Sequence, residues 1–168
     1  MHEQSTPNGR IRRLGDGRFE GRLQRTFEAH APATVWRMLT DSASLAQWLA
    51  PGSIEPRQGG RARIDFVDSG IVIDSEVTEF SAPERLAYSW SSKDQPARPL
   101  RWELAPAGAG TCVTLTVGTP AGEDPAKACA GFEAHLEMLA AALEGVPIKF
   151  PFDLFMAARK AYSAQIGG

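Results

Sequence analysis

His135 and Tyr88 are the side chains best suited to acid–base chemistry inside a folded domain. His135 follows Phe132 by about one helical turn in an apolar stretch, and an imidazole there could anchor a polar group or carry a proton. Tyr88 occupies an inward position of an alternating segment, so its hydroxyl could meet a ligand or a backbone group. The simpler interpretation of His135 is a half-exposed helical histidine bonded to a loop or to water, and we prefer it.

The other reactive residues form no recognisable catalytic or metal-binding motif. Cys112 and Cys129 are the only cysteines, they form no CxxC pair, and the three histidines do not cluster with them. There is no GxSxG nucleophile motif, and the glycine pair at 59–60 precedes a strand pattern rather than a helix. We therefore predict no catalytic residue, no metal and no cofactor, and we expect both thiols to be free.

Asp65, Asp74 and Glu76 are the carboxylates that could form an acid–base pair. They alternate with Ile64 and Ile73, however, so they belong to the opposite, solvent-facing side of their strands. We interpret them as part of a solvated charge pattern with Arg61, Arg63 and Arg101.

A long helix over residues 126–145 is the element that positions His135. Its apolar stripe recurs every three or four residues and consists of Phe132, Leu136, Leu139 and Leu143. Asp124 can cap its start, Pro125 suits the first helical position, and Gly145 suits a left-handed stop. Glu133, Glu137 and Glu144 fall away from the centre of that stripe, so the helix is amphipathic and needs an apolar surface to cover.

An antiparallel sheet supplies that surface. Strand patterns occur at residues 11–14, 19–28, 61–66, 71–78, 86–91, 100–104 and 111–117, with apolar and polar residues in alternation. Arg25 interrupts the apolar face of the second pattern, and we expect it near a sheet end or reaching toward solvent. Two short helices are predicted between the second and third of these, at residues 32–39 and 42–49. The predicted fold class is therefore α+β, a curved antiparallel sheet wrapped around the long helix.

The chain divides into three parts. Residues 1–8 are polar and predicted to be flexible, residues 9–146 form the main domain, and residues 147–168 form a C-terminal extension. Prolines at 147 and 151 keep the start of this extension out of a helix. A last helix is predicted at residues 153–165, packed on the domain or on a partner, and the pattern does not choose between the two.

Composition argues against several classes of function. A net charge of −2 over 168 residues creates no strong field for nucleic acid. No apolar run reaches the length of a membrane span, and residues 1–20 lack a secretory signal. We expect a cytoplasmic protein that neither binds nucleic acid nor inserts into a membrane.

Several motifs resemble one family. The segment APATVWRMLTDSASLAQWLAP at residues 31–51 is similar to the opening signature of the bacterial homologues of the heat-shock protein 90 ATPase activator. The similarity continues in order through EPRQGGRARIDF (55–66), ERLAYSW (84–90), RWELAPAGAGTCVTLTV (101–117) and GFEAHLEMLAAALEG (131–145), and covers roughly residues 9–166. That family belongs to the START-like, or SRPBCC, superfamily, so the resemblance implies a helix-grip fold.

The resemblance also implies a ligand cavity between the long helix and the concave face of the sheet. Its candidate lining consists of Trp36, Trp48, Phe66, Tyr88, Trp90, Trp102, Phe132, His135, Leu136 and Leu139. Because aromatic residues dominate protein cores in any case, the alternative is that these residues only fill the core. Phe132-Glu133 and Phe152 stand where relatives often carry Trp-His and Trp, and these departures change the shape of the space that the helix overlooks.

Three functions are compatible with these features. We rank first the non-catalytic binding of a small lipophilic ligand in the cavity, because inward aromatic residues occur without a catalytic constellation. A cyclase- or hydrolase-type enzyme that uses the same cavity through His135 and Tyr88 comes second. A protein-interaction domain that modulates a chaperone ATPase is implied by the resemblance alone. The chain could be a monomer or a homodimer.

Overall fold

The computed structural model describes residues 9–167, and the N-terminal segment predicted to be flexible, residues 1–8, lies outside them. The strands form one antiparallel sheet in the order β1-β2-β8-β7-β6-β5-β4-β3. They are β1 (Gly9–Arg13), β2 (Phe19–Phe27), β3 (Gly52–Ile54), β4 (Arg61–Phe66), β5 (Ile71–Ser81), β6 (Arg85–Ser89), β7 (Pro99–Ala107) and β8 (Gly110–Thr119). Consecutive strands pair as hairpins from β3 to β8, and β2 then pairs with β8.

The alternating pattern of these strands creates a row of apolar side chains across the sheet. Leu115 of β8 lies opposite Leu23 of β2 on one side and opposite Trp102 of β7 on the other, and Trp102 lies opposite Leu86 of β6. All of these side chains are at most 1% exposed. Because successive residues of a strand point to opposite faces, this row identifies the covered face of the sheet.

The described helices are α1 (Pro32–Thr40), α2 (Ser42–Trp48), α3 (Pro125–Leu143) and α4 (Phe152–Ile166). The predicted cap of α3 is present, because the Asp124 carboxylate accepts a hydrogen bond from the backbone N–H of Ala126. Asp41 caps α2 in the same manner, through the N–H of Ser44. Gly145 has a φ of 79° just after α3, a left-handed conformation that glycine adopts without steric cost.

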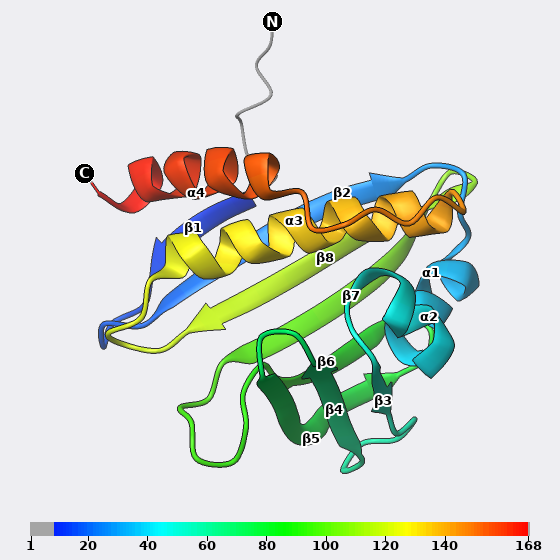
Figure 1. The fold of residues 1–168 in the computed structure, drawn as a ribbon, viewed down its shortest axis with the longest axis horizontal. Helices are drawn as coiled ribbons and strands as arrows, with labels where there is room; N and C mark the ends of the chain where they lie inside the picture. Colours follow the sequence, from blue (N-terminus) through cyan, green and yellow to red (C-terminus); the bar gives the residue numbers. More distant parts are fainter. Residues whose placement is uncertain (1–8, 168) are drawn as a thin grey trace, which may run out of the picture.

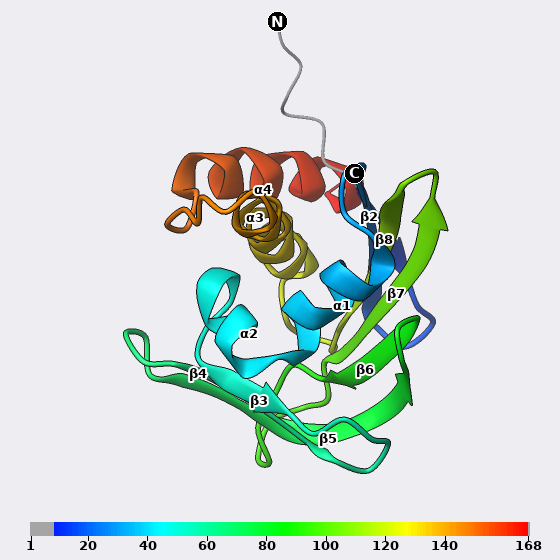
Figure 2. The same ribbon diagram turned by 90° about the vertical axis from the view of Figure 1, so that its right-hand side faces the viewer.

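The sheet curves around α3, as Figures 1 and 2 show. In Figure 2 the long helix is seen nearly end-on inside the bend, while α1 and α2 occupy the space between it and the β3–β6 part of the sheet. The opposite, convex face carries no helix in either view. This arrangement confirms the predicted α+β fold, a curved antiparallel sheet closed by a long helix.

Helix α4 packs against α3 and β1 of the same chain. The Tyr162 hydroxyl donates to Glu133 Oε1 at 2.7 Å, and Gln165 Oε1 accepts from the backbone N–H of Ile11 at 2.9 Å. Glu133 is only 6% exposed, although its place outside the apolar stripe of α3 had predicted a solvent-facing side chain. The stripe alone could not reveal this burial, because the covering element lies about 29 residues further along the chain.

Two other local features differ from the sequence-based expectation. Strand β3 was not predicted, because three residues are too few for alternation to be visible. Arg25 does not reach into solvent: its guanidinium donates to Glu137 Oε1 on α3 at 2.8 Å, in a partly buried ion pair. No helix in the described part of the chain is long and apolar enough to cross a membrane.

Candidate functional site

Trp48, the last residue of α2, is at the centre of the candidate site. Its indole Nε1–H donates to the carbonyl oxygen of Met38 in α1 at 2.7 Å, which fixes the ring. The ring centroid lies 5.9 Å from that of Trp102 on β7 and 6.5 Å from that of His135 on α3. One buried ring therefore links the sheet, the short helix and the long helix.

More rings surround His135 on its other sides. The ring centroids of Phe66, Phe132 and Phe150 lie 6.1, 6.0 and 5.7 Å from that of the imidazole. Trp90 joins them through an edge-to-face contact of 5.0 Å with Phe132, a geometry that aromatic pairs favour. We call the whole group the aromatic cluster, and it comprises Trp48, Phe66, Tyr88, Trp90, Trp102, Phe132, His135 and Phe150.

The aromatic cluster has a buried end and a partly exposed end. Trp48, Trp102 and Tyr88 are at most 2% exposed, whereas His135 is half-buried and Phe150 is 40% exposed. The extended segment that joins α3 to α4 runs back along α3 in Figure 1, and this path brings Phe150 onto the imidazole. His135 and Phe150 therefore form the end of the aromatic cluster that lies nearer to solvent.

His135 carries a polar atom that is enclosed without a partner. The Nδ1 atom is buried and makes no hydrogen bond within the described residues, although the residue as a whole is half-buried. Burial lowers the pKa of the imidazole to about 4, and the backbone of Trp48 acts more weakly in the opposite direction. The side chain is thus a neutral imidazole at physiological pH, and its half-buried position on α3 is the half-exposed helical position that we preferred from the sequence.

Trp102 is the second residue of the aromatic cluster with a buried polar atom that lacks a partner among the described residues. Its Nε1–H has no hydrogen-bond partner among the described residues. Burial raises the pKa of the Tyr88 hydroxyl well above its usual range, and the Trp102 side chain beside that hydroxyl acts in the opposite direction. A third unpartnered atom, Thr119 Oγ1, lies outside the cluster at the end of β8.

The structure brings together most, but not all, of the residues that the sequence suggested for the ligand site. Trp36 stands apart from the aromatic cluster, with its ring 5.5 Å from Phe80 of β5. Leu136 and Leu139 are buried on α3. Phe150 was missed, because it lies in an extended segment with no periodic pattern, and only the return of the chain over α3 places it on His135.

The acidic residues lie away from the aromatic cluster. Asp74 forms an ion pair with Arg61, and Asp65 lies 3.6 Å from Arg63. Arg61 lowers the pKa of the Asp74 carboxyl, so this group favours its charged form. Within residues 9–167, no group of three or more His, Cys, Asp and Glu side chains is arranged to hold a metal ion.

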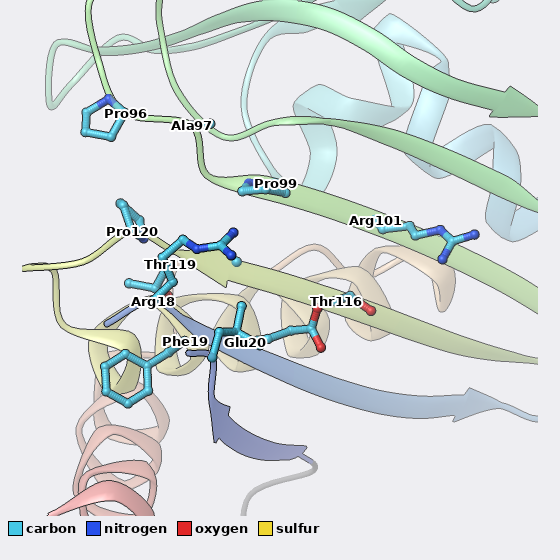
Figure 3. A pocket seen from close by; sticks show the side chains of 12 residues that line it. Arg18, Phe19, Glu20, Pro96, Ala97, Pro99, Arg101, Thr116, Thr119 and Pro120 are labelled. Carbon is cyan, nitrogen blue, oxygen red and sulfur yellow. The ribbon is translucent and has the colours of Figure 1, made fainter. Parts of the chain in front are cut away.

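A separate hollow of about 450 Å³ lies on the face of the sheet opposite α3 (Figure 3). It is bordered by the β1–β2 turn at Arg18, by Pro96 and Pro99 before and in β7, and by Thr116 and Pro120 at the end of β8. None of the ten residues predicted to line a ligand cavity borders it. Its Arg18 side chain is already bonded to Asp16, so the hollow presents no free cation there.

Residues 29–144 match the family described as Activator of Hsp90 ATPase homolog 1-like protein. The chain belongs to this family. The match spans α1, α2, strands β3–β8 and all of α3, and therefore includes every residue of the aromatic cluster except Phe150. The family membership that the sequence motifs indicated is therefore confirmed. A search among curated proteins gave no significant match.

Solved structures similar to this chain share its fold at low sequence identity. CalU16 from Micromonospora echinospora is 18% identical, with a TM-score of 0.77 over 95% of this chain and 98% of that one. The protein encoded by gene BPP1335 of Bordetella parapertussis is 24% identical, with a TM-score of 0.68 over 96% and 94%. The Aha1 dimer from Colwellia psychrerythraea is 18% identical, with a TM-score of 0.63 over 73% and 94%.

Proposed function

We propose that this protein binds a small, largely apolar molecule between α3 and the concave face of the sheet, at the aromatic cluster. The observation that carries this proposal concerns two buried nitrogen atoms, Trp102 Nε1 and His135 Nδ1, on rings that both contact the indole of Trp48. Neither atom has a hydrogen-bond partner among residues 9–167. Binding sites for small molecules combine mostly apolar walls with a few polar atoms that fix the ligand.

A purely structural core explains these two nitrogen atoms less well. Buried polar groups in folded proteins are nearly always paired with protein or ordered water, and an unpaired one costs about 1–3 kcal/mol. Phenylalanine at positions 102 and 135 would keep aromatic packing without that cost. A third molecule that satisfies both nitrogen atoms removes the conflict.

Binding is better supported than catalysis at this site. A general base works best when its pKa lies near the operating pH, whereas burial lowers the pKa of His135 to about 4. Burial also raises the pKa of Tyr88, which makes its hydroxyl harder to ionise. Both groups are therefore better suited to hydrogen bonding than to proton transfer at neutral pH.

Native mass spectrometry of gently purified protein tests the proposal, with the denatured mass as reference. We expect a discrete excess mass that disappears on denaturation. The variant Leu139→Phe should carry less bound ligand than the wild type, because the larger side chain adds bulk at a fully buried position of α3, one turn after His135. Leu143→Phe, the same change at a half-buried position one turn further along, is the matched control and should retain the excess mass.

A protein that is free of ligand by this measurement, and whose melting temperature does not change with a panel of apolar compounds, would contradict the proposal. Ligand binding to the native state alone must raise the melting temperature. A rise of the melting temperature with any compound of the panel would therefore reveal a binding site that had lost its ligand during purification.

An exposed apolar strip supports a second proposal, which concerns a protein partner. Val146, Ile148, Phe150, Phe152 and Met156 are each at least 40% exposed and follow one another along the α3–α4 connection and α4. The structure of Aha1 from Colwellia psychrerythraea is described as a dimer. We propose that a second copy of this chain covers the strip.

Analytical ultracentrifugation of the wild-type protein and of Phe152→Ser tests the dimer. We expect the dimer to weaken in the variant, because Phe152 is 60% exposed in the single chain and would be buried in the dimer. Val67→Ser, which removes an even more exposed side chain outside the strip, should leave the association unchanged. A wild-type protein that stays monomeric at all concentrations would exclude a second copy.

A further inference from the structure

The last turn of α4 covers the outer edge of β1, which is an edge strand of the sheet. The side-chain amide of Gln165 makes two hydrogen bonds with this edge. Its Nε2 donates to the Gly9 carbonyl oxygen at 3.1 Å, and its Oε1 accepts from the backbone N–H of Ile11 at 2.9 Å. These two backbone groups face away from β2 and would otherwise pair with a neighbouring strand. The Gln165 side chain therefore takes the place of a further strand.

This cover is held by few contacts. Tyr162 is fully buried and anchors the middle of α4, but the helix continues beyond it only through residues 163–166, of which the first three are exposed. Besides Gln165, the turn contacts β1 through a hydrogen bond from Arg13 Nη2 to the Ile166 carbonyl oxygen, and the Ile166 side chain is partly buried. Terminal turns of this kind open locally at low free energy, so this one can leave β1 while Tyr162 keeps the rest of α4 in place.

The edge also carries positive charge. Arg10 of β1 lies directly opposite Arg22 of β2, both are exposed, and neither forms an ion pair within residues 9–167. Arg12, two residues along, is bonded to Glu20. Like charges directly opposite each other destabilise a strand pair, and an acidic partner would remove that cost. A second copy of β1 would instead bring its own arginines to this edge.

Ile11 adds an apolar requirement. It alternates with Arg10 and Arg12 along β1, and its partly buried side chain packs against the core. Neighbouring strands place their side chains on the same two faces. A strand added beside β1 would therefore match it best with acidic residues on the arginine face and apolar residues on the Ile11 face.

We propose that the outer edge of β1 is a binding site for an extended acidic peptide in which acidic and apolar residues alternate, and that the last turn of α4 is an autoinhibitory cap over this site. The peptide displaces Gln165 and pairs with the backbone of residues 9–13, as in other cases of strand addition to a sheet edge. Its carboxylates lie beside Arg10 and Arg22.

Binding of matched synthetic peptides to the full-length protein tests the proposal. The peptide VEVEVEV, acetylated and amidated at its ends, should bind in isothermal titration calorimetry. VEPEPEV carries the same charge, but its prolines lack the N–H groups that strand pairing needs, and it should not bind. VKVKVKV keeps the alternation and reverses the charge, and it should not bind either.

Variants of the cap and of the edge sharpen the test. Gln165→Ala removes both hydrogen bonds that hold the cap closed, so it should raise the affinity for VEVEVEV about tenfold by increasing the open population. Ser163→Ala is the matched control in the same turn, because this exposed side chain makes no hydrogen bond within the described residues, and it should leave the affinity unchanged. Arg10→Gln should weaken binding about threefold.

Hydrogen exchange of the Ile11 backbone N–H, followed by NMR, reports directly on the edge. This group should exchange slowly in the wild type, where it donates to Gln165, and faster in Gln165→Ala. Bound VEVEVEV should make it slow again in the variant. A peptide held only by charge on the arginine face would leave the exchange of this group fast.

Several results would overturn the proposal. If VEVEVEV binds neither protein, or binds the wild type and Gln165→Ala equally, the last turn of α4 is not a cap over a binding site. If VEPEPEV binds as well as VEVEVEV, or the bound peptide leaves the Ile11 N–H unprotected, strand addition is wrong. If Gln165→Ala forms dimers in which this N–H is protected without peptide, the occupant is a second copy and the assignment to an acidic peptide is wrong.

Discussion

The neutral imidazole of His135 predicts a specific dependence of stability on pH. In the folded protein its pKa is lowered to about 4 by burial, from an ordinary value of 6.5. The unfolded chain therefore takes up a proton at a higher pH than the folded chain does. As pH falls below about 6.5 the unfolded state gains protons first, so the protein loses stability, and the loss levels off near pH 4.

The magnitude follows from the size of the shift. A difference of one pKa unit corresponds to about 1.4 kcal/mol, so a shift of this size amounts to roughly 3 kcal/mol at low pH and about 2 kcal/mol at pH 5. His135→Phe removes the titrating group and the unpartnered nitrogen while keeping aromatic contact with Trp48 and Phe132. The free energy of unfolding of the wild type, relative to this variant, should therefore fall by about 2 kcal/mol between pH 8 and pH 5.

Urea denaturation of both proteins at pH 8, 7, 6 and 5 measures this difference. All other ionisable groups are present in both proteins and largely cancel in the comparison. NMR titration of the His135 ring in the folded wild type provides a second check, with an expected midpoint near pH 4. A wild-type-minus-variant difference that is the same at pH 8 and pH 5 would refute the reasoning.

Three further predictions concern the packing of α3. A Cβ at Gly21 would lie 2.2 Å from the Sγ of Cys129, so Gly21→Ala should lower the free energy of unfolding by about 2 kcal/mol, as overpacking does. In a Cys129→Ala background the same change should cost at least about 1 kcal/mol less. Equal costs in the two backgrounds, measured by urea denaturation, would show that the contact is unimportant. Tyr162→Phe removes the hydrogen bond to the buried Glu133 and should lower the free energy of unfolding by about 1–2 kcal/mol at pH 7. An unchanged melting temperature would mean that other contacts hold α4 in place. Burial raises the pKa of the Cys129 thiol to about 12, whereas Cys112 is only half-buried. A disulfide reagent at pH 8 should therefore modify only Cys112 quickly in the native protein and both thiols after denaturation. Rapid modification of both thiols in the native protein would contradict the burial of Cys129.

Local signals in the sequence were sufficient for the fold class and for every described element except β3. Asp124, Pro125 and Gly145 mark the ends of α3 through interactions within a few residues of the chain, and the structure has that helix at Pro125–Leu143. Alternation likewise identified the longer strands, because apolar side chains at every second position reflect a sheet with one covered face. Strand β3 was missed because its three residues are too few to show alternation. Its pairing with β4 determines it.

The neighbours of each side chain depended on contacts between distant segments. Alternation placed Arg25 on the inward face of β2, but only the approach of α3 supplies Glu137 as its partner. Glu133 looked exposed from the helical pattern, and it is buried because α4 returns over it with Tyr162. Both outcomes arise from the packing of separate elements, which a pattern within one element does not contain.

The candidate site shows the same division. The sequence by itself determined that aromatic residues of α2, α3 and the strands would face inward, because that follows from periodicity, and it marked His135 and Tyr88 as the polar members. Only the tertiary structure decided that Trp36 lies apart with Phe80, that Phe150 covers His135, and that the nitrogen atoms of Trp102 and His135 are left without partners. The physical reason is that a hydrogen bond requires a donor and an acceptor within about 3 Å, and that distance is set by how the sheet bends around α3.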